Sequence, residues 1–277
     1  AGLGWRLMFF VLGFLGVIWA FAWFIIFRDN PSRSKHVSAY ELDHIKKRPH
    51  VTSEAALAHD EQTTSWKFIL FNKSFLVNNY AFFAFGYLLF FSINWLPGYL
   101  QQTYGFEVKK AGWFLLGPWT TATVLVVIGG IISDRLWRKT HSIRIARSHL
   151  IWICQVLSVI SFIPVILSHS LIVSMIGLSL GVGFGMMPNA AFYAINADLA
   201  HDRAATSLGV MTCASSFSAI LAPFLTGLLS SWTGDFSIAI LLMMGLMLSS
   251  ALMIILFQHP DRVLAKKWEK KAIHLTN

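Results

Sequence analysis

Long apolar segments recur along this chain, and they constrain its fold more than any other feature of the sequence. The hydrocarbon core of a bilayer, about 30 Å thick, is crossed by about 20 apolar residues in a helix. Segments of about that length or longer cover residues 5–27, 68–100, 111–133, 149–168, 171–200, 206–230 and 237–257. The sequence therefore predicts seven membrane-spanning helices.

The composition agrees with a membrane protein. The 277 residues are 56% hydrophobic and 13% charged, and the mean hydropathy is +0.61, which leaves too little polar surface for a soluble globule of this size. Spanning β-strands would alternate apolar and polar residues, and runs such as "LIVSMIGLSLGVGFGMM" do not alternate. The predicted fold class is therefore all-α, a polytopic transmembrane helix bundle.

The net charge of +9 follows from the positions of the basic residues. If the first helix starts outside, 18 of the 22 Lys and Arg lie in connections on the inner side, at 28–67, 134–148, 201–205 and after 258. Such an excess on one side orients membrane proteins with that side in the cytoplasm. We therefore expect a cytoplasmic C-terminus, contact with the lipid bilayer and no nucleic-acid partner.

The pattern of helices and connections predicts four parts. The opening "AGLGWR" has no initiator Met, and the number of spans is odd, so the first helix is interpreted as the last span of an absent N-terminal half. The parts are that helix (1–28), a cytoplasmic linker with short helices (29–66), a six-helix transmembrane bundle (67–258) and a cytoplasmic tail (259–277).

The linker contains one helix start signal. In "VSAYEL", Ser38 and Glu41 have the spacing of a capping box, in which a serine hydroxyl accepts from a backbone N–H at the helix start. The sequence predicts a short helix from Ala39 to about Arg48, stopped by Pro49.

A charged motif follows the third apolar segment. "GGIISDRLWRK" places Gly130, Asp134, Arg135 and Arg138 on a predicted tight cytoplasmic turn. It resembles the signature loop of the major facilitator superfamily, which the resemblance implies latches the cytoplasmic side in the outward-open state. We expect the glycine to let a neighbouring helix approach and the aspartate to lie against a helix N-terminus. We expect Asp198 to join this cytoplasmic latch by pairing with Arg135 or Arg138.

Two further stretches resemble one branch of that superfamily, the anion:cation symporters. They are "GYLLFFSINWLPGYLQQTYGF" and "GMMPNAAFYAINADLAHDRAATSLGVMTCASSFSAILAPFLTGLL". The resemblance implies the C-terminal six-helix half of the fold plus one preceding helix, in a bacterial inner membrane. It also implies secondary active transport of a small organic anion with a proton or sodium ion, by alternating access and without a cofactor. Thr212 and Tyr193 differ from residues common in sugar-acid carriers, so a sugar acid and another carboxylate both stay open.

Polar residues within the spans follow helical spacing. Tyr80, Tyr87 and Asn94 are seven apart, Asn189, Tyr193 and Asn196 are four and three apart, and Thr212, Ser215 and Ser216 form a third cluster. Because polar groups are costly in hydrocarbon unless they face one another or water, we expect these faces to share an aqueous site near the midplane. The predicted substrate-binding residues are Tyr87, Asn94, Asn189, Tyr193, Thr212 and Ser216.

Gly177, Gly181 and Gly185 repeat at every fourth position on the same apolar segment. A small residue at every fourth position lets two helices pack closely, and flexing during transport is the alternative use.

Other classes of membrane protein explain the sequence less well. A seven-helix receptor would also have "DR" after its third helix, but the first inner connection here is nearly 40 residues long. A facilitator for another class of solute remains open. None of the ten His lies clearly at mid-span and no H-E-x-x-H occurs, so we expect neither an enzyme nor a metal site.

Cys154 and Cys213 both fall inside spans, where we expect no disulfide.

Overall fold

The structure is a computed structural model that describes residues 5–28, 32, 34, 37, 38, 40–43, 65–168, 170–200 and 203–265. It divides into two units, Ala1–Glu61 and Gln62–Asn277, and each is described by itself. Within the described residues, seven helices are long and apolar enough to cross a membrane. The predicted all-α polytopic class is therefore confirmed.

The first unit contains one spanning helix, α1 (Trp5–Ile26), which buries none of its described side chains in the unit. Further along, the predicted helix start in the linker is present. Glu41 N–H donates to Ser38 Oγ at 3.1 Å, and residues 40–43 are helical. The remainder of the helix predicted from Ala39 to Arg48 lies outside the described residues.

The second unit contains the other six spans. Its elements are α4 (Trp66–Phe71), α5 (Lys73–Tyr104), α6 (Val108–Phe114), α7 (Leu116–Thr140), the π-helical turn η2 (Arg144–Ser148), α8 (His149–Leu167), α9 (Leu171–Met186), α10 (Asn189–Ala200), α11 (Ala204–Thr233) and α12 (Ser237–Phe257). Several helices extend beyond the predicted apolar segments, because a helix continues through polar residues once it has left the hydrocarbon.

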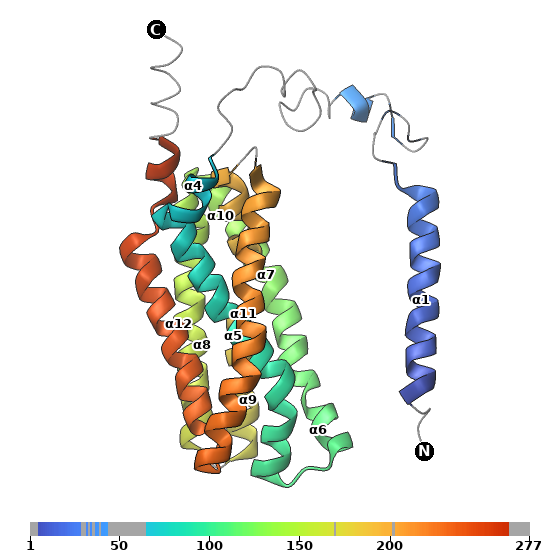
Figure 1. Ribbon diagram of the computed structural model, residues 1–277, viewed down its shortest axis with the longest axis vertical. Coiled ribbons are helices and arrows are strands. Elements are labelled where there is room, and N and C mark those ends of the chain that lie inside the picture. Colours follow the sequence, from blue (N-terminus) through green and yellow to red (C-terminus); the bar gives the residue numbers. More distant parts are fainter. Residues whose placement is uncertain are drawn as a thin grey trace. The chain divides into compact units, whose positions relative to one another are not determined.

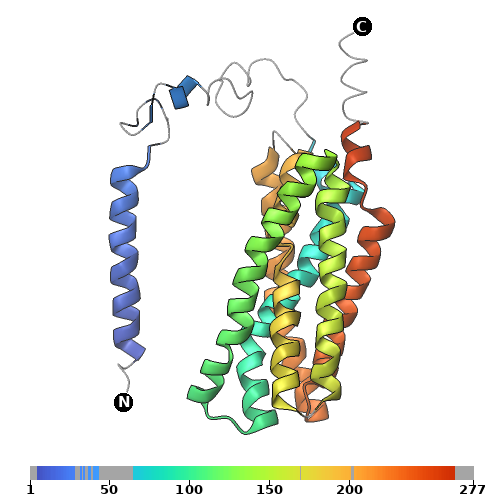
Figure 2. The same cartoon turned by 180° about the vertical axis from the view of Figure 1, so that it is seen from behind.

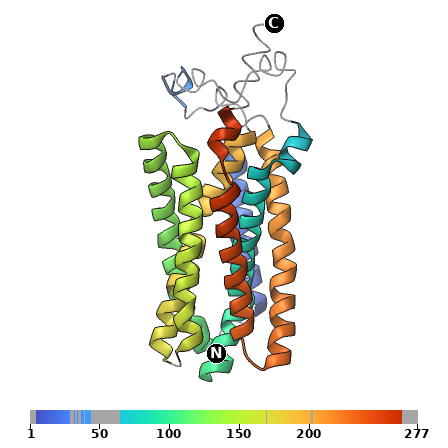
Figure 3. The ribbon, with the colours of Figure 1, turned by 90° about the vertical axis from the view of Figure 1, so that its left-hand side faces the viewer.

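The six spans form one bundle with a continuous apolar core. α5 lies between α11 and α12 (Figures 1 and 3), and α9 lies between α7 and α8 (Figure 2). α8 also packs on α12, which joins the two sets of helices. The core is dominated by Phe, Leu, Ile and Met side chains, with Phe75, Phe162 and Phe192 fully buried. α7 and α11 expose more of their surface than α5 or α9.

Proline affects two of the spans differently. α5 continues through Pro97, whereas the span from Leu171 to Ala200 is interrupted at Met187 and Pro188. A proline has no N–H to donate to the preceding turn, so the helical hydrogen-bond pattern is broken there. The interruption makes Asn189 the first residue of α10.

The repeated glycines of α9 are packing residues, as predicted. A Cβ at Gly177 would lie 2.8 Å from Ser161 O, one at Gly181 would lie 2.6 Å from the Phe162 ring, and one at Gly185 would lie 2.0 Å from Leu88 Cδ2. A larger residue at Gly177 would meet the backbone of α8, and at Gly181 or Gly185 it would force the Phe162 or Leu88 side chain to shift, so α9 packs closely on α8 and α5.

Candidate functional site

The predicted substrate residues lie on three helices of the second unit. Asn94 on α5, Tyr193 on α10, and Thr212 and Ser216 on α11 are exposed. Asn189 is half-buried at the start of α10. Five of the six predicted residues therefore reach the surface of the unit.

Three of these exposed side chains bond back to their own helices. Asn94 Nδ2 donates to Phe90 O at 2.7 Å. Thr212 Oγ1 donates to Leu208 O at 2.9 Å, and Ser216 Oγ donates to Thr212 O at 3.0 Å. A hydroxyl oxygen keeps its lone pairs after donating, and an amide keeps a second N–H and its carbonyl oxygen. Each group can therefore also bind a polar ligand.

Tyr87 differs from the prediction, because it is buried between α5 and α11 with 1% of its surface exposed. Its hydroxyl interacts with that of Thr226, but neither makes a hydrogen bond of normal geometry. The indole N–H of Trp95, also on α5, is likewise buried without a partner. A buried polar atom without a partner costs about 1–3 kcal/mol. The Tyr87 and Trp95 groups on α5 and the Thr226 hydroxyl on α11 are therefore buried without a hydrogen bond of normal geometry.

The three polar residues of α5 do not share one environment. Tyr80 Oη lies 2.7 Å from Ser249 Oγ of α12, Tyr87 faces α11, and Asn94 is exposed. Seven residues are about 10 Å apart along a helix axis, so these side chains lie at different levels of the bundle. α5 packs on both α11 and α12, and each of the three side chains therefore meets a different environment.

A buried amide cluster, Asn78, Asn79, Asn196 and Gln258, was not predicted. Asn78 Nδ2 donates to Asn196 Oδ1 at 3.0 Å, and Gln258 Nε2 donates to Asn78 Oδ1 at 3.1 Å. Asn196 Nδ2 donates to Asn79 Oδ1 at 3.1 Å and to Ser207 O at 3.4 Å. Asn196 therefore belongs to a helix contact and not to the exposed face of Tyr193. The adjacent Asn78 and Asn79 in an apolar segment were the feature of the sequence that could have indicated this cluster.

The latch residues lie on a helix and not on a turn. α7 continues to Thr140, so Asp134, Arg135 and Arg138 occupy its last two turns and are exposed. The chain turns only at His141, which has a φ of 50°. Within the described part of the chain, these three side chains make no ion pair with one another or with another residue.

Asp198 pairs with Arg147, which corrects the prediction of a pair with Arg135 or Arg138. Arg147 lies on η2, where it also stacks over the Trp137 ring at 5.5 Å from the centroid. The η2 turn packs against α10, the helix of Asp198. The arginine from the start of the next span is therefore closer to the acid than those at the end of α7.

Asp134 was expected to lie against a helix N-terminus, but Asp261 is the aspartate that does so. Its carboxylate accepts a hydrogen bond from Ser142 Oγ at 2.6 Å. It also accepts from the backbone N–H groups of Ile143 at 2.8 Å and Arg144 at 3.2 Å. A carboxylate in this position satisfies N–H groups that have no partner in the first helical turn, and it interacts favourably with the helix dipole. Asp261 therefore caps the span that begins at Arg144.

The close helix contact in the motif is made by Gly129 and not by Gly130. A Cβ at Gly129 would lie 2.1 Å from Met187 O, in the interruption between α9 and α10. A Cβ at Gly130 would meet no described atom within 4 Å. The expected packing role was therefore assigned to the wrong one of two adjacent glycines.

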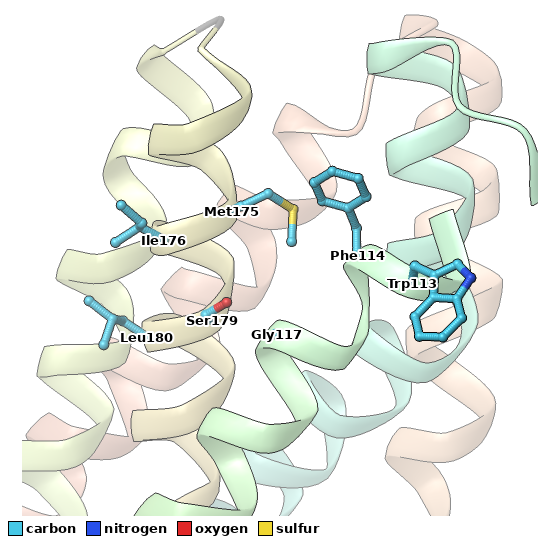
Figure 4. Close-up of a pocket in the computed structure, with 7 residues that line it drawn as sticks. All are labelled: Trp113, Phe114, Gly117, Met175, Ile176, Ser179 and Leu180. Atoms are coloured by element: carbon cyan, nitrogen blue, oxygen red, sulfur yellow. The ribbon is translucent and has the colours of Figure 1, made fainter. Parts of the chain in front are cut away.

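Two apolar pockets lie along the groove between α7 and α9. Their volumes are about 520 and 310 Å³, and Leu180 lines both. In the larger one, Trp113 and Phe114 lie across from Met175 and Ile176 (Figure 4). None of the predicted substrate residues lines either pocket. The polar candidates and the apolar pockets are therefore separate features of the unit.

Both cysteines are free, with Cys154 buried and Cys213 exposed. In the part of the chain that the structure describes, no group of three His, Cys, Asp or Glu side chains is arranged to hold a metal ion.

Known proteins resemble this chain over most of its length. A probable sulfoacetate transporter of Cupriavidus necator is 29% identical over 238 residues, which are 86% of this chain and 54% of that protein. A hexuronate transporter of Bacillus subtilis is 28% identical over 261 residues, 92% of this chain and 58% of that protein. A probable galactarate/D-glucarate transporter of Escherichia coli is 29% identical over 251 residues, 86% of this chain and 54% of that protein.

The chain spans about half the length of these curated relatives. The sequence profile of the Major Facilitator Superfamily matches residues 1–151, from α1 into the start of α8. That match covers more than half of the chain, and the seven apolar helices agree with it. The chain therefore belongs to the Major Facilitator Superfamily.

Proposed function

We propose that this chain is part of a secondary active transporter of a small organic anion, which works by alternating access with a proton or sodium ion. The observation that carries the proposal is similarity over 86–92% of the chain to proteins named as transporters of sulfoacetate, hexuronate and galactarate or glucarate. Sulfonate and carboxylate groups make all of these compounds anions. No enzymatic activity is proposed.

Neutral hydrogen-bonding groups are proposed to orient the anion. Asn94, Tyr193, Thr212 and Ser216 are exposed on α5, α10 and α11, and each has capacity for a further hydrogen bond. Tyr193 packs edge-on against Phe82 at 5.4 Å between ring centroids, which fixes its ring while leaving 40% of its surface exposed. Asn189 and the buried Tyr87 complete the proposed set, and Tyr87 would join it when α5 and α11 separate.

The positive partner of the anion and the coupling group are proposed to lie in an N-terminal half. Within the described spans of the second unit, Lys and Arg occur only near helix ends, at positions such as Lys73, Lys109 and Arg147. Transferring an anion into a low dielectric is costly unless a countercharge accompanies it. A half-transporter with neutral donors alone would therefore hold the anion weakly.

The orientation is proposed from the distribution of basic residues. α7 and α12 end, and α11 begins, at the same end of the bundle (Figure 1). Arg135 and Arg138 lie in the last turns of α7, Arg203 directly before α11 and Arg262 shortly after α12. The positive-inside rule places that end in the cytoplasm, which for a bacterial carrier means the inner face of the inner membrane.

Uptake by proteoliposomes that contain the longer parent protein tests the function. Labelled hexuronate, galactarate and sulfoacetate are offered with a proton gradient, with a sodium gradient and with neither. We expect saturable accumulation of at least one anion that needs one of the two gradients. A neutral hexose serves as the control substrate. Transport of the hexose but of none of the anions would contradict the proposal and favour a facilitator for another class of solute.

A further inference from the structure

The short helix α4 precedes the first span of the second unit and leaves it at an angle. Asn72 joins α4 to α5 with extended backbone angles (φ −70°, ψ 130°), and its Oδ1 accepts from Ser74 N–H at 2.9 Å to cap α5. α4 therefore does not continue the axis of α5. It lies at the edge of one end of the bundle (Figure 3).

α4 has one face on the bundle and one apolar face that is exposed. Ile69 is fully buried, and Phe68 packs edge-on against Phe75 with 5.8 Å between ring centroids. Trp66, Leu70 and Phe71 are 54%, 41% and 73% exposed. A stable contact with the bundle therefore fixes the orientation of a helix that presents two aromatic rings and a leucine outward.

The surroundings of this exposed face are basic. Lys67 and Lys73 are exposed, and the Arg203 guanidinium lies over the Trp66 ring at 5.9 Å from its centroid. The sequence from Gln62 to Phe106 contains no acidic residue. Exposed apolar rings beside exposed lysines fit a membrane surface, where apolar acyl chains lie beneath negatively charged headgroups.

We propose that α4 is an interfacial anchor that binds the anionic phospholipids of the leaflet at this end of the bundle. Its position supports this partner, because α4 immediately precedes Lys73, where the apolar span begins, and so lies at the level of the headgroups. Tryptophan and phenylalanine side chains insert at the boundary of headgroups and acyl chains, while nearby lysines are attracted to anionic lipids. The anchor is separate from the proposed substrate site and does not depend on it.

Spin labelling of the full chain in nanodiscs tests the anchor. A label is attached at Phe71→Cys in a background of Cys154→Ala and Cys213→Ser, and its accessibility to oxygen and to a water-soluble nickel chelate is measured. In bilayers of phosphatidylglycerol and phosphatidylcholine, we expect oxygen to reach the label more readily than nickel. A label at Thr140→Cys, at the exposed end of α7, is the matched control and should favour nickel.

The charge requirement is tested with the variant Lys67→Gln, Lys73→Gln that carries the same label at Phe71→Cys. We expect nickel accessibility to rise in this variant, and to rise in the parent when phosphatidylglycerol is omitted. A label that favours nickel in phosphatidylglycerol bilayers, as the control does, would overturn the proposal. A label shielded from both reagents would also overturn it, because protein and not lipid would then cover α4.

Discussion

Buried polar residues of the second unit fall into a paired and an unpaired group. The amides of Asn78 and Asn196 bond to each other and to neighbouring helices, whereas the hydroxyls of Tyr87 and Thr226 have no partner of normal geometry. A buried network in which every polar group is hydrogen-bonded stabilises the packing of its helices. A buried hydroxyl without a hydrogen bond destabilises the same packing. Substitutions in the two groups should therefore affect folding in opposite directions.

Tyr87→Phe should leave thermal stability in detergent unchanged or higher, because no hydrogen bond is lost. If the hydroxyl binds substrate, the apparent affinity should fall by about 2- to 13-fold, which corresponds to about 0.5–1.5 kcal/mol for one hydrogen bond. Asn189→Ala should weaken affinity by a similar amount. Asn78→Leu is the control that should lower stability. Unchanged affinity in both Tyr87→Phe and Asn189→Ala would show that these side chains serve packing.

In the proposed full-length transporter, Asp134→Asn should abolish most uptake while membrane insertion and thermal stability stay normal. The carboxylate is exposed and makes no ion pair within the described residues. The substitution therefore removes a charge without removing a contact that stabilises the fold. Asp198→Asn breaks the pair with Arg147 and should lower thermal stability as well. Normal uptake by a correctly inserted Asp134→Asn protein would refute the latch role.

At the scale of helices, close contacts and end caps set how the spans fit together. α7 meets the interruption of α9 and α10 at Gly129, and the segment after α12 meets the start of the α8 span through Asp261. Backbone groups take part in both contacts, and backbone cannot move aside as a flexible side chain can. These contacts should therefore be sensitive to single substitutions.

Gly129→Ala should destabilise the bundle by about 1–3 kcal/mol, the usual cost of adding a methyl group to a filled contact. The added Cβ would overlap Met187 O, so α7 or the interruption must shift. Gly130→Ala is the matched control on the next residue, where the Cβ has open space. Thermal unfolding of both variants measures the difference in their stability. Equal stabilities would show that α7 can move away from Met187 without loss of stability.

Asp261→Ala should cost about 0.5–2 kcal/mol, the usual effect of removing a helix N-cap. Two backbone N–H groups and the Ser142 hydroxyl lose their acceptor in this variant. Arg262→Ala changes the exposed neighbouring residue and should be close to neutral. Hydrogen exchange at Ile143 and Arg144 should accelerate only in Asp261→Ala. Unchanged exchange there would mean that the cap does not hold the start of this span.

At the scale of the whole molecule, the six spans of the second unit form one bundle with a shared core. Its exposed candidate residues Asn94, Tyr193, Thr212 and Ser216 lie on α5, α10 and α11, and of these helices α11 leaves the most surface uncovered. The stretches that match this chain make up only 54–58% of these relatives. We therefore expect the proposed transport activity to require more than the bundle described here.

Residues 1–277 reconstituted alone should insert into liposomes but show no ion-driven accumulation of anions. Neutral donors can orient an anion, but the described spans place no Lys or Arg at their centres to balance its charge. The proposed full-length transporter, reconstituted in parallel, is the control and should accumulate substrate. Saturable, ion-driven uptake by residues 1–277 would contradict this prediction and would give Asp198 a central role.

The spanning helices and several local contacts could be predicted from the order of the amino acids. The length of each apolar segment predicts a span, because every backbone N–H and C=O group in the hydrocarbon needs a hydrogen bond. A helix supplies these bonds within one segment. The Ser38 cap and the packing face of Gly177, Gly181 and Gly185 were also predictable, since their spacing lies within one helix. Family resemblance, carried by the motif at Asp134, was likewise readable from the chain.

The contacts between residues of different helices could not be predicted in this way. The partner of Asp198 is Arg147, the cap of the α8 span is Asp261, the close approach is at Gly129, and Tyr87 is buried. Each of these depends on how far a helix is rotated about its axis and where its neighbour is interrupted. Spacing along one helix specifies which residues share a face but not toward which neighbour that face is turned.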